Sequence, residues 1–376
     1  MKKLTIGLIC PCSFLIAGGV QEHTTNLGNA LTKIGCNIVY LSPDINSDLL
    51  PHPHISTGVS IRVPTPNGSW TEISLALHSR SQIRHLINTY KIDVLHFQEL
   101  LTPFSSWTWL KASNVPSVAT FHSGWEIHDN KNPFESILKL IKPQLTPNLT
   151  QSITVSEVSS ACNSLLLVNN QIIPPAINTN IALNIINMPL TYNSKYNILF
   201  IGRLDERKGA ENLVLAFNKL PSKIKRLTTL HIIGDGPKKP FLEYLINKYQ
   251  LSSSVVLYGK VSGMSRVPFF QHADAIIAPT THGESFGMVL IEALASGCPV
   301  IVGNNDGYKE TLKDYPYQQY ILDPKNHQLL ANAITSLLTH PDHQKNIKFW
   351  AKTFVKQFDS MNIAKKHLQI YQKILE

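Results

Sequence analysis

Thr281–Val300, with the sequence THGESFGMVLIEALASGCPV, is the stretch from which the expected architecture follows. The apolar run His272–Pro279 comes directly before it and is typical of a buried strand. Gly283 and Ser285 suit a turn and a helix N-cap, and apolar residues then recur at helical spacing over Phe286–Ala295. The stretch therefore predicts a strand, a turn and a helix, and the unpaired N–H groups of such a helix start suit a phosphate.

Two carboxylates, Glu284 and Glu292, frame the predicted helix. If both were helical, they would stand about 12 Å apart along the axis. A retaining glycosidase needs its two carboxyl groups about 5–5.5 Å apart and an inverting one about 6.5–9.5 Å apart, so the spacing disfavours a hydrolase. It favours one carboxylate that touches a sugar at the turn and another that reaches ribose hydroxyls, with a diphosphate between them.

The E-x7-E pattern Glu284–Glu292, inside GESFGMVLIEALASGCPV, closely resembles the donor-site signature of family 4 glycosyltransferases. Taken alone, this spacing would indicate an amphipathic helix with two solvated acids. The flanking residues favour the family instead, because five of them match its pattern: Gly283, Phe286, Gly287, Gly297 and Pro299. The resemblance implies an α/β fold of the GT-B type, in which two Rossmann-like domains with parallel sheets face a central cleft.

The length of 376 residues also predicts two domains of about 180 residues each. With the resemblance, we expect an acceptor-side domain over residues 1–180 and a nucleotide-sugar domain over residues 181–358. Residues 359–376 are expected to form a helix that crosses back to the first domain.

The net charge of +9 is uneven along the chain. Residues 1–190 carry 11 Lys and Arg against 10 Asp and Glu, a net charge of +1, and the remaining residues carry 23 against 15, a net charge of +8. This excess suits nucleotide phosphates, an anionic membrane surface or solubility. Nucleic acid is not an expected partner, because no helix-turn-helix, zinc-finger spacing or interleaved basic and aromatic motif is present.

Cysteine and histidine usage predicts neither a metal nor a bound cofactor. The five cysteines are an odd number without framework spacing, which fits a reducing compartment, and the histidines form no H-E-x-x-H pattern. The N-terminus imitates a signal peptide, but Pro11 breaks its apolar stretch and an A-x-A-like end is missing. We therefore expect a cytoplasmic protein, soluble or peripheral on the inner face of the membrane.

The start of the chain predicts a βαβ unit. Leu4–Cys10 is a continuous apolar run, Val20–Ile34 has the pattern of a helix, and Asn37–Ser42 is the next strand. Gly18 and Gly19 lie at the carboxyl end of the first strand, where ligands bind in such sheets. The loop is not G-x-G-x-x-G, which argues against a nicotinamide cofactor. It resembles the glycine loop with which the family brings its backbone close to the donor phosphates.

His122 follows the predicted strand Ser117–Phe121, at the end that faces the same crevice. A lone histidine is usually structural. In the family that ATFH resembles, this histidine lies beside the donor sugar, and the resemblance carries that role to His122. One nearby segment departs from the family pattern, since Pro175 and Ala176 replace its usual Asn and Gly.

A helix expected over Ser74–Tyr90 carries Arg80, Arg84 and His85. These side chains suit either a solvated helix face or contact with an anionic lipid surface, and the solvated face is favoured.

The second domain is expected to begin, after a polar linker over Asn178–Tyr196, with the strand Asn197–Ile201. The loop Gly202–Gly209 then matches the family pattern G-R-x4-K-G. Arg203 and Lys208 in this loop would form a diphosphate clamp, since a guanidinium and an ammonium suit that anion. Two further donor contacts are expected near the nucleotide: Val261 and Arg266.

The resemblance implies a retaining, metal-independent transfer of a sugar from a nucleotide diphosphate to a hydroxyl. Arg203, Lys208 and the helix start at Ser285, Phe286 and Gly287 would stabilise the departing diphosphate. Glu284 and His122 would position the sugar, and Glu292 would bind the ribose. The sequence supplies no separate nucleophile.

Within the family, GGVQEH, ATFH and THGESFGMVLIEA resemble phosphatidylinositol mannosyltransferases and related lipid-directed enzymes. This favours a lipid or cell-envelope glycan acceptor, an anionic membrane surface as a partner, and GDP-mannose or a UDP-hexose as donor. A small soluble acceptor, a non-catalytic nucleotide-sugar-binding protein and an epimerase remain alternatives. The oligomeric state is left open.

Overall fold

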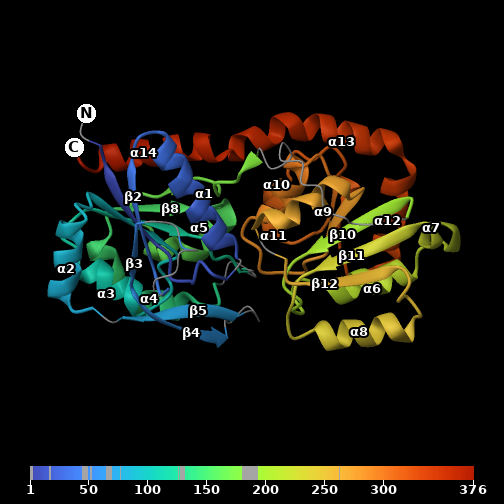
Figure 1. Cartoon of the computed structure of the whole chain (residues 1–376), viewed down its shortest axis with the longest axis horizontal. Coiled ribbons are helices and arrows are strands. Elements are labelled where there is room, and N and C mark those ends of the chain that lie inside the picture. The colour runs from blue at the N-terminus through green and yellow to red at the C-terminus, as the bar shows by residue number, and fades with distance from the viewer. Residues whose placement is uncertain are drawn as a thin grey trace. The chain divides into compact units, whose positions relative to one another are not determined.

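The chain forms two compact α/β units in a computed structural model. One comprises Met1–Ile177 with Phe358–Glu376, and the other comprises Asn178–Gln357 (Figure 1). The structure describes residues 3–16, 18–44, 50, 53–64, 70–76, 78–125, 127, 132–179, 194–261 and 263–376. The expected α/β fold with parallel sheets in two domains is confirmed.

A parallel sheet runs through the first unit. Its strands, as far as the chain is described, follow the order β3-β2-β1-β6-β7-β8-β9. Their bounds are β1 Thr5–Ile9, β2 Asn37–Ser42, β3 His54–Ser56, β6 Val94–Gln98, β7 Ser117–Phe121, β8 Gln151–Thr154 and β9 Gln171–Ile172. In the centre of the sheet, Gly7 pairs with Val39 of β2 and with Leu95 of β6. β1, β6 and β7 are buried throughout, because helices cover both faces.

Two hydrophobic cores lie on opposite faces of this sheet. Helices α1 (Gly19–Lys33) and α14 (Ser360–Lys373) pack on each other and contribute to one core with side chains such as Leu27 and Ile363. Helices α2 (Arg80–Thr89), α3 (Ser105–Ala112) and α4 (Glu135–Leu145) contribute to the other core, with Trp109 and Leu138 among its members. The unit therefore has three layers, helix, sheet and helix (Figure 1).

The second unit has a parallel sheet of its own, with the described strands in the order β12-β11-β10-β13-β14-β15. Their bounds are β10 Tyr196–Ile201, β11 Thr228–Ile233, β12 Val255–Gly259, β13 Ala275–Ala278, β14 Val300–Gly303 and β15 Ile321–Leu322. Its helices are α6 Ala210–Asn218, α7 Ser222–Arg226, α8 Lys239–Lys248, α9 Val267–His272, α10 Met288–Ala295, α11 Asp306–Thr311, α12 His327–Thr339 and α13 Pro341–Phe354. Because every strand runs the same way, the loops after β10 and β13 emerge at one edge of the sheet.

The helix expected over Ser74–Tyr90 is wrong in its first part. Strand β5 (Trp70–Ala76) pairs antiparallel with β4 (Gly58–Pro64), and the helix begins only at Arg80. Ser79 fixes this start, since its hydroxyl accepts from the Gln82 N–H and its own N–H donates to the Gln82 side chain. The alternating side chains of the WTEISLA segment indicate the strand that the helix prediction overlooked.

The strand expected over His272–Pro279 is shorter than predicted. His272 ends the helix α9, and only Ala275–Ala278 form β13. A helix that the sequence pattern predicts over Ser156–Val168 is also shorter in the structure: α5 covers Glu157–Asn163, and a 3-10 turn follows it at Ser164. The predicted linker over Asn178–Tyr196 lies mostly outside the described residues, as does Ala17 of the glycine loop.

None of the five cysteines forms a disulfide, and four of them are buried. Within the ranges given above, no helix combines the length and the apolar composition needed to cross a membrane.

Candidate functional site

The loop between β10 and α6 is shaped by a buried carboxylate, Asp205. It accepts hydrogen bonds from the Lys208 N–H at 3.0 Å and from Arg203 Nε at 3.1 Å. Asp205 is only 3% exposed, so these contacts fix the backbone between the two basic residues. The structure thus places Arg203 and Lys208 in one loop, with Arg203 paired to Asp205.

A second loop, after β13, brings Glu284 against this first loop. The Thr281 N–H donates to the Arg207 carbonyl at 2.9 Å, which joins the two loops through their backbones. Arg207 Nη1 lies 2.5 Å from Glu284 Oε1, and Lys208 Nζ lies 2.6 Å from the same oxygen. We call Arg207, Lys208 and Glu284 the charged cluster. Arg207 was missed by the sequence analysis, although it stands next to Lys208 at the end of the G-R-x4-K-G loop.

The charged cluster is poorly exposed and carries more positive than negative groups. Burial by itself would raise the pKa of Glu284, but Lys208 and Arg207 outweigh it and lower that pKa below its ordinary value. Burial lowers the pKa of Lys208, which Glu284 only partly offsets. Two cations that share one carboxylate leave a net positive charge, which an anionic ligand can neutralise.

The turn before α10 differs from the prediction. The helix begins at Met288, two residues later than expected, and its N-cap is Gly287 with φ 90°, not Ser285. A side chain at Gly287 would also meet the Tyr308 ring at 2.5 Å, so both the positive φ and the lack of space require glycine. Phe286 is buried and its carbonyl accepts from the Thr311 hydroxyl at 2.6 Å. Ser285 and Phe286 therefore belong to the turn that carries Glu284.

Glu292 lies on α10 and is 3% exposed. It pairs with Arg266, whose Nη2 lies 3.5 Å from Glu292 Oε1. Arg266 ends a short 3-10 turn, Gly263–Arg266, and Val261 precedes that turn. The structure thus joins two of the predicted donor contacts, Glu292 and Arg266, in a pair separate from the charged cluster.

The first unit holds the other predicted site residues. His122 follows β7, and its Nε2–H donates to the Gln98 side-chain oxygen at 3.0 Å. Burial lowers the pKa of the His122 imidazole to about 3, so the ring is neutral near pH 7. Gly18 and Gly19 lie at the start of α1, where Gly18 is the extended N-cap residue.

Three further histidines, unmarked by the sequence analysis, gather around His122. The His23 ring packs against it in an edge-to-face arrangement with centroids 5.0 Å apart. His96 is hydrogen-bonded to Tyr371 at 2.6 Å, and its ring lies 5.5 Å from that of His367. Burial lowers the pKa of all three additional imidazoles. We call His23, His96, His122 and His367 the histidine group.

The departure from the family pattern at Pro175 and Ala176 contacts this group. The Ala176 N–H donates to His23 Nδ1 at 2.9 Å, and its carbonyl accepts from the Asn26 side chain at 3.2 Å. Because His23 Nδ1 is an acceptor here, the ring proton is on Nε2. Ala176 is fully buried and so serves to hold His23.

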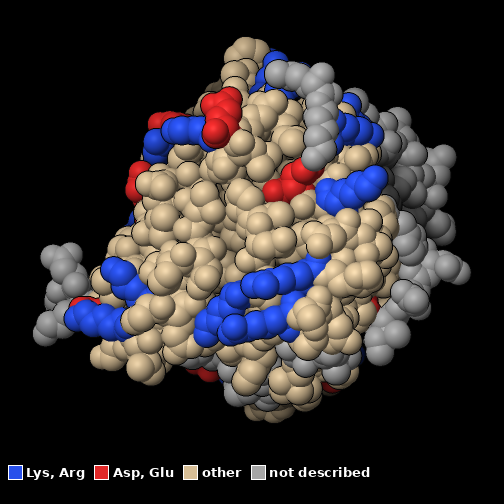
Figure 2. Space-filling model, turned by 90° about the vertical axis from the view of Figure 1, so that its left-hand side faces the viewer, with Lys and Arg blue, Asp and Glu red and all other residues tan. Residues whose placement is uncertain are grey.

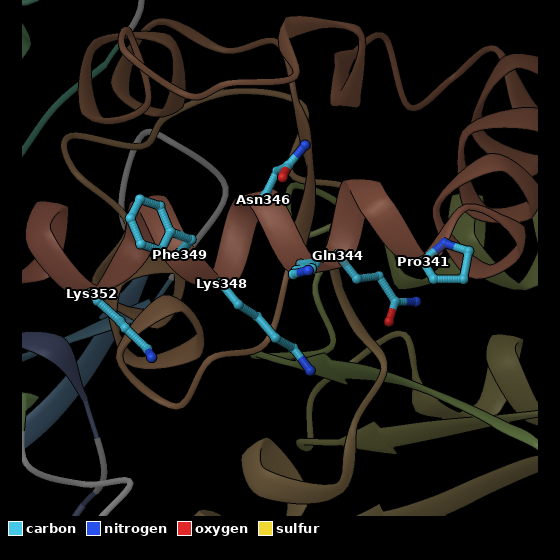
Figure 3. Close-up of a pocket in the computed structure, with 7 residues that line it drawn as sticks. Pro341, Gln344, Asn346, Lys348, Phe349 and Lys352 are labelled. Atoms are coloured by element: carbon cyan, nitrogen blue, oxygen red, sulfur yellow. The ribbon is translucent and has the colours of Figure 1, made fainter.

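One hollow lies along α13 and contains no residue of the histidine group. It has a volume of about 450 Å³ and is lined by α13, where Figure 3 shows Lys348, Phe349 and Lys352 extending from the helix. It shares no residue with the charged cluster, and we assign no chemistry to it. Among the described residues, His, Cys, Asp and Glu side chains form no group of three or more able to hold a metal ion.

Comparison with known proteins gives two family matches. The family described as "Glycosyltransferase Family 4" matches residues 17–180, and the one described as "Glycosyl transferases group 1" matches residues 184–353.

Two relatives and one solved structure match nearly the whole chain. The phosphatidyl-myo-inositol mannosyltransferase of Mycobacterium leprae is 26% identical and covers 99% of this chain and 97% of its own. The α-monoglucosyldiacylglycerol synthase of Acholeplasma laidlawii is 23% identical, with 98% of both chains covered. An Anabaena protein, HepE, solved in complex with UDP-glucose, superposes with a TM-score of 0.75 at 17% identity over 98% of this chain and 100% of its own.

Proposed function

Because the chain belongs to the family 4 and group 1 glycosyltransferases and has their GT-B fold, we propose that it moves a hexose from a nucleotide diphosphate sugar to a hydroxyl acceptor. The observation that carries this proposal is the charged cluster, in which Arg207 and Lys208 converge on Glu284. A buried surplus of positive charge at the loop end of a parallel sheet suits a diphosphate.

The reaction we propose retains the anomeric configuration. The bond between the anomeric carbon and the diphosphate oxygen breaks, and its electron pair leaves with the diphosphate. The acceptor oxygen forms the new bond on the same face of the sugar, and its proton passes to the departing diphosphate. Arg207 and Lys208 stabilise the charge that develops on the leaving group, so the chain itself supplies the electrostatic catalysis that a metal ion gives elsewhere.

The remaining residues would position the donor. When the diphosphate binds the two cations, Glu284 becomes available to accept hydrogen bonds from sugar hydroxyls. Glu292, beside Arg266, would accept from the ribose hydroxyls, and Arg203 would add a further contact to the diphosphate. His122 would contact the sugar as a neutral group.

The donor sugar and the acceptor are inferred from the relatives. One is named as a mannosyltransferase acting on phosphatidyl-myo-inositol, another as a synthase of a glucosyldiacylglycerol, and HepE was solved with UDP-glucose. We therefore propose GDP-mannose or a UDP-hexose as donor and a lipid as acceptor.

A surface of the first unit supports a lipid acceptor. Phe104, directly before α3, is 50% exposed and Leu140 on α4 is 72% exposed. The basic residues Arg80, Lys111 and Lys139 lie on α2, α3 and α4. Arg80, Phe104 and Lys111 line one hollow of about 340 Å³. Figure 2, which views the side on which α2 lies in Figure 1, shows a broad band of Lys and Arg side chains. Apolar and basic side chains together suit an anionic membrane surface.

The transfer is tested by incubating the purified chain with GDP-mannose, UDP-glucose and UDP-N-acetylglucosamine and with vesicles of phosphatidylinositol or diacylglycerol. We expect a glycolipid from one donor, and a loss of about 100-fold or more in Glu284→Gln. Glu243→Gln, an exposed carboxylate on α8, serves as the matched control. Donor hydrolysis without a glycolipid, or full activity in Glu284→Gln, would contradict the proposal.

The membrane contact is tested separately by vesicle flotation. Binding should rise with the fraction of anionic lipid and weaken in the double variant Phe104→Ser, Leu140→Ser. Phe349→Ser removes a side chain that is 79% exposed on the second unit and should leave flotation unchanged. Absence of flotation with anionic vesicles would remove the membrane from the proposed partners, and equal flotation on neutral vesicles would remove the role of the basic side chains.

A further inference from the structure

Glu99, directly after β6, has a backbone conformation that L-residues rarely adopt. Its φ is 74°, and the residue is only 8% exposed. A non-glycine residue in the left-handed region is strained unless its surroundings hold it there, and such strain tends to occur at functional sites. Here the surroundings are the loop that carries His122.

The carboxylate of Glu99 is fully occupied by this loop and by its own turn. Oε2 accepts from the His122 N–H at 3.1 Å, from the Ser123 N–H at 2.8 Å and from the Ser123 hydroxyl at 2.6 Å. Oε1 accepts from the Leu101 N–H at 3.2 Å. Four donors on one buried carboxylate clamp the strand ends of β6 and β7 together.

The neighbouring residue, Gln98, holds the same histidine from its side chain. Gln98 is fully buried, and its side-chain oxygen accepts from His122 Nε2 at 3.0 Å. Consecutive residues therefore fix both halves of His122, Glu99 the backbone and Gln98 the ring. This leaves the imidazole one orientation relative to the sheet.

We propose that Glu99 is a positioning residue for His122, which sets the place of the imidazole by binding the backbone of residues 122 and 123. The inference rests on the proposed function, because the ring has to be placed for contact with the donor sugar. Glu99 itself touches no substrate in this account. The strained backbone of Glu99 places its carboxylate within hydrogen-bond distance of residues 122 and 123, which follow β7.

The test compares Glu99→Gln with Asp93→Asn. Asp93 is a carboxylate at the opposite end of the same strand, where it accepts from the Thr5 N–H at 2.9 Å, so Asp93→Asn makes the same change from carboxylate to amide far from the histidine. The amide of Glu99→Gln cannot accept from all four donors. We expect amide exchange at His122 and Ser123 to speed up at least tenfold, kcat to fall about tenfold, and nucleotide affinity to stay unchanged. Asp93→Asn should leave all three values as in the wild type.

Ser123→Ala provides a milder variant should Glu99→Gln fold poorly. It removes only the hydroxyl donor and should lower kcat two- to threefold with unchanged nucleotide affinity. A fast-exchanging loop with normal kcat would overturn the positioning role, as would unchanged exchange in Glu99→Gln. The exchange measurement needs no turnover. If the wild type transfers no sugar, the proposed function fails while the exchange data still decide whether Glu99 holds His122.

Discussion

The charged cluster of the second unit and the histidine group of the first unit are built on opposite electrostatic principles. In the charged cluster, Arg207 and Lys208 share one carboxylate and keep a net positive charge. In the histidine group, burial lowers the pKa of every imidazole, so all four rings are neutral near pH 7. His122 and the charged cluster both follow strands of a parallel sheet, so the difference comes from the side chains and not from the fold.

The difference indicates that the two regions have different roles in binding the substrate. A cluster with surplus charge gains most from an ionic ligand, which a diphosphate provides. A neutral, hydrogen-bonded group carries no net charge, so it can orient uncharged hydroxyls through its hydrogen bonds and its shape. The comparison therefore predicts that changes of pH, of charge and of salt affect the two regions differently.

The largest expected effect is of pH on the stability of the first unit. The folded pKa of each buried imidazole lies below the unfolded value, so unfolding takes up protons once the pH falls below about 6.5. Stability is therefore complete above that pH and is lost as the pH falls toward 4. For the three most buried rings, His23, His96 and His367, the loss between pH 7.5 and 5.5 is about 4 kcal/mol in unfolding free energy.

This loss is measured by hydrogen exchange with denaturant, read separately in β1, β6 and β7 and in β10 and β13. The charged cluster adds no such loss, since its cations hold the Glu284 pKa below its ordinary value despite burial. The second unit should therefore lose less stability than the first, with His231, whose pKa burial lowers to about 4, as one contribution. If the unfolding free energy of the first unit stayed constant or rose as the pH fell from 7.5 to 5.5, the comparison would be contradicted.

The next effect is the loss of a cation from the charged cluster. Lys208→Ala should lower kcat/KM by about 100-fold, or about 3 kcal/mol, because one group that stabilises the leaving diphosphate is gone. Steady-state kinetics measure it. Lys219→Ala, an exposed lysine just after α6, is the control and should be neutral. A loss of less than threefold in kcat/KM for Lys208→Ala would show that the charged cluster does not stabilise the leaving diphosphate.

Removal of the His122 ring should have a smaller effect. His122→Ala deletes one neutral contact to the sugar, so we expect kcat to fall about tenfold and the Kd for the free nucleotide to stay unchanged. Kinetics together with calorimetry separate the two quantities, and His85→Ala on the surface of α2 serves as the control. A weakened nucleotide Kd in His122→Ala would show that the two regions do not divide the work as described.

The smallest effect is that of salt. Nucleotide affinity should weaken roughly threefold between 50 and 500 mM NaCl, because screening acts on the partly accessible cations of the charged cluster. The kcat at saturating donor should change little, since His122 is neutral. Salt-independent affinity would indicate that the nucleotide is held mainly by uncharged contacts.

Much of the fold followed from the sequence because buried parallel strands have a plain signature. Asn37–Ser42 and Ser117–Phe121 were predicted with their observed bounds, since their apolar runs stop at clear turn residues. The helix expected over Ser74–Tyr90 was wrong only in its first part, where the structure has the end of strand β5. The start of α10 failed because the positive φ of Gly287 places the helix start after that residue.

The site was harder to predict, because its contacts join residues distant in the chain. Glu284 and Lys208 were named from the family pattern, but the position of Arg207 depends on how Asp205 folds the loop. The histidine group required α14, which brings His367 to histidines more than 240 residues earlier, a separation of about 800 Å in fully extended chain. Sequence spacing alone therefore does not predict that these histidines are neighbours in space.

The most direct test of the account is a calorimetric titration of the full chain with GDP and with UDP, for the wild type and for the double variant Arg207→Ala, Lys208→Ala. The account predicts that one nucleotide binds the wild type and that its affinity falls at least tenfold in the double variant, with the folded state intact by hydrogen exchange. Binding of neither nucleotide, or equal affinity in the double variant, would contradict the assignment of the charged cluster as the diphosphate site.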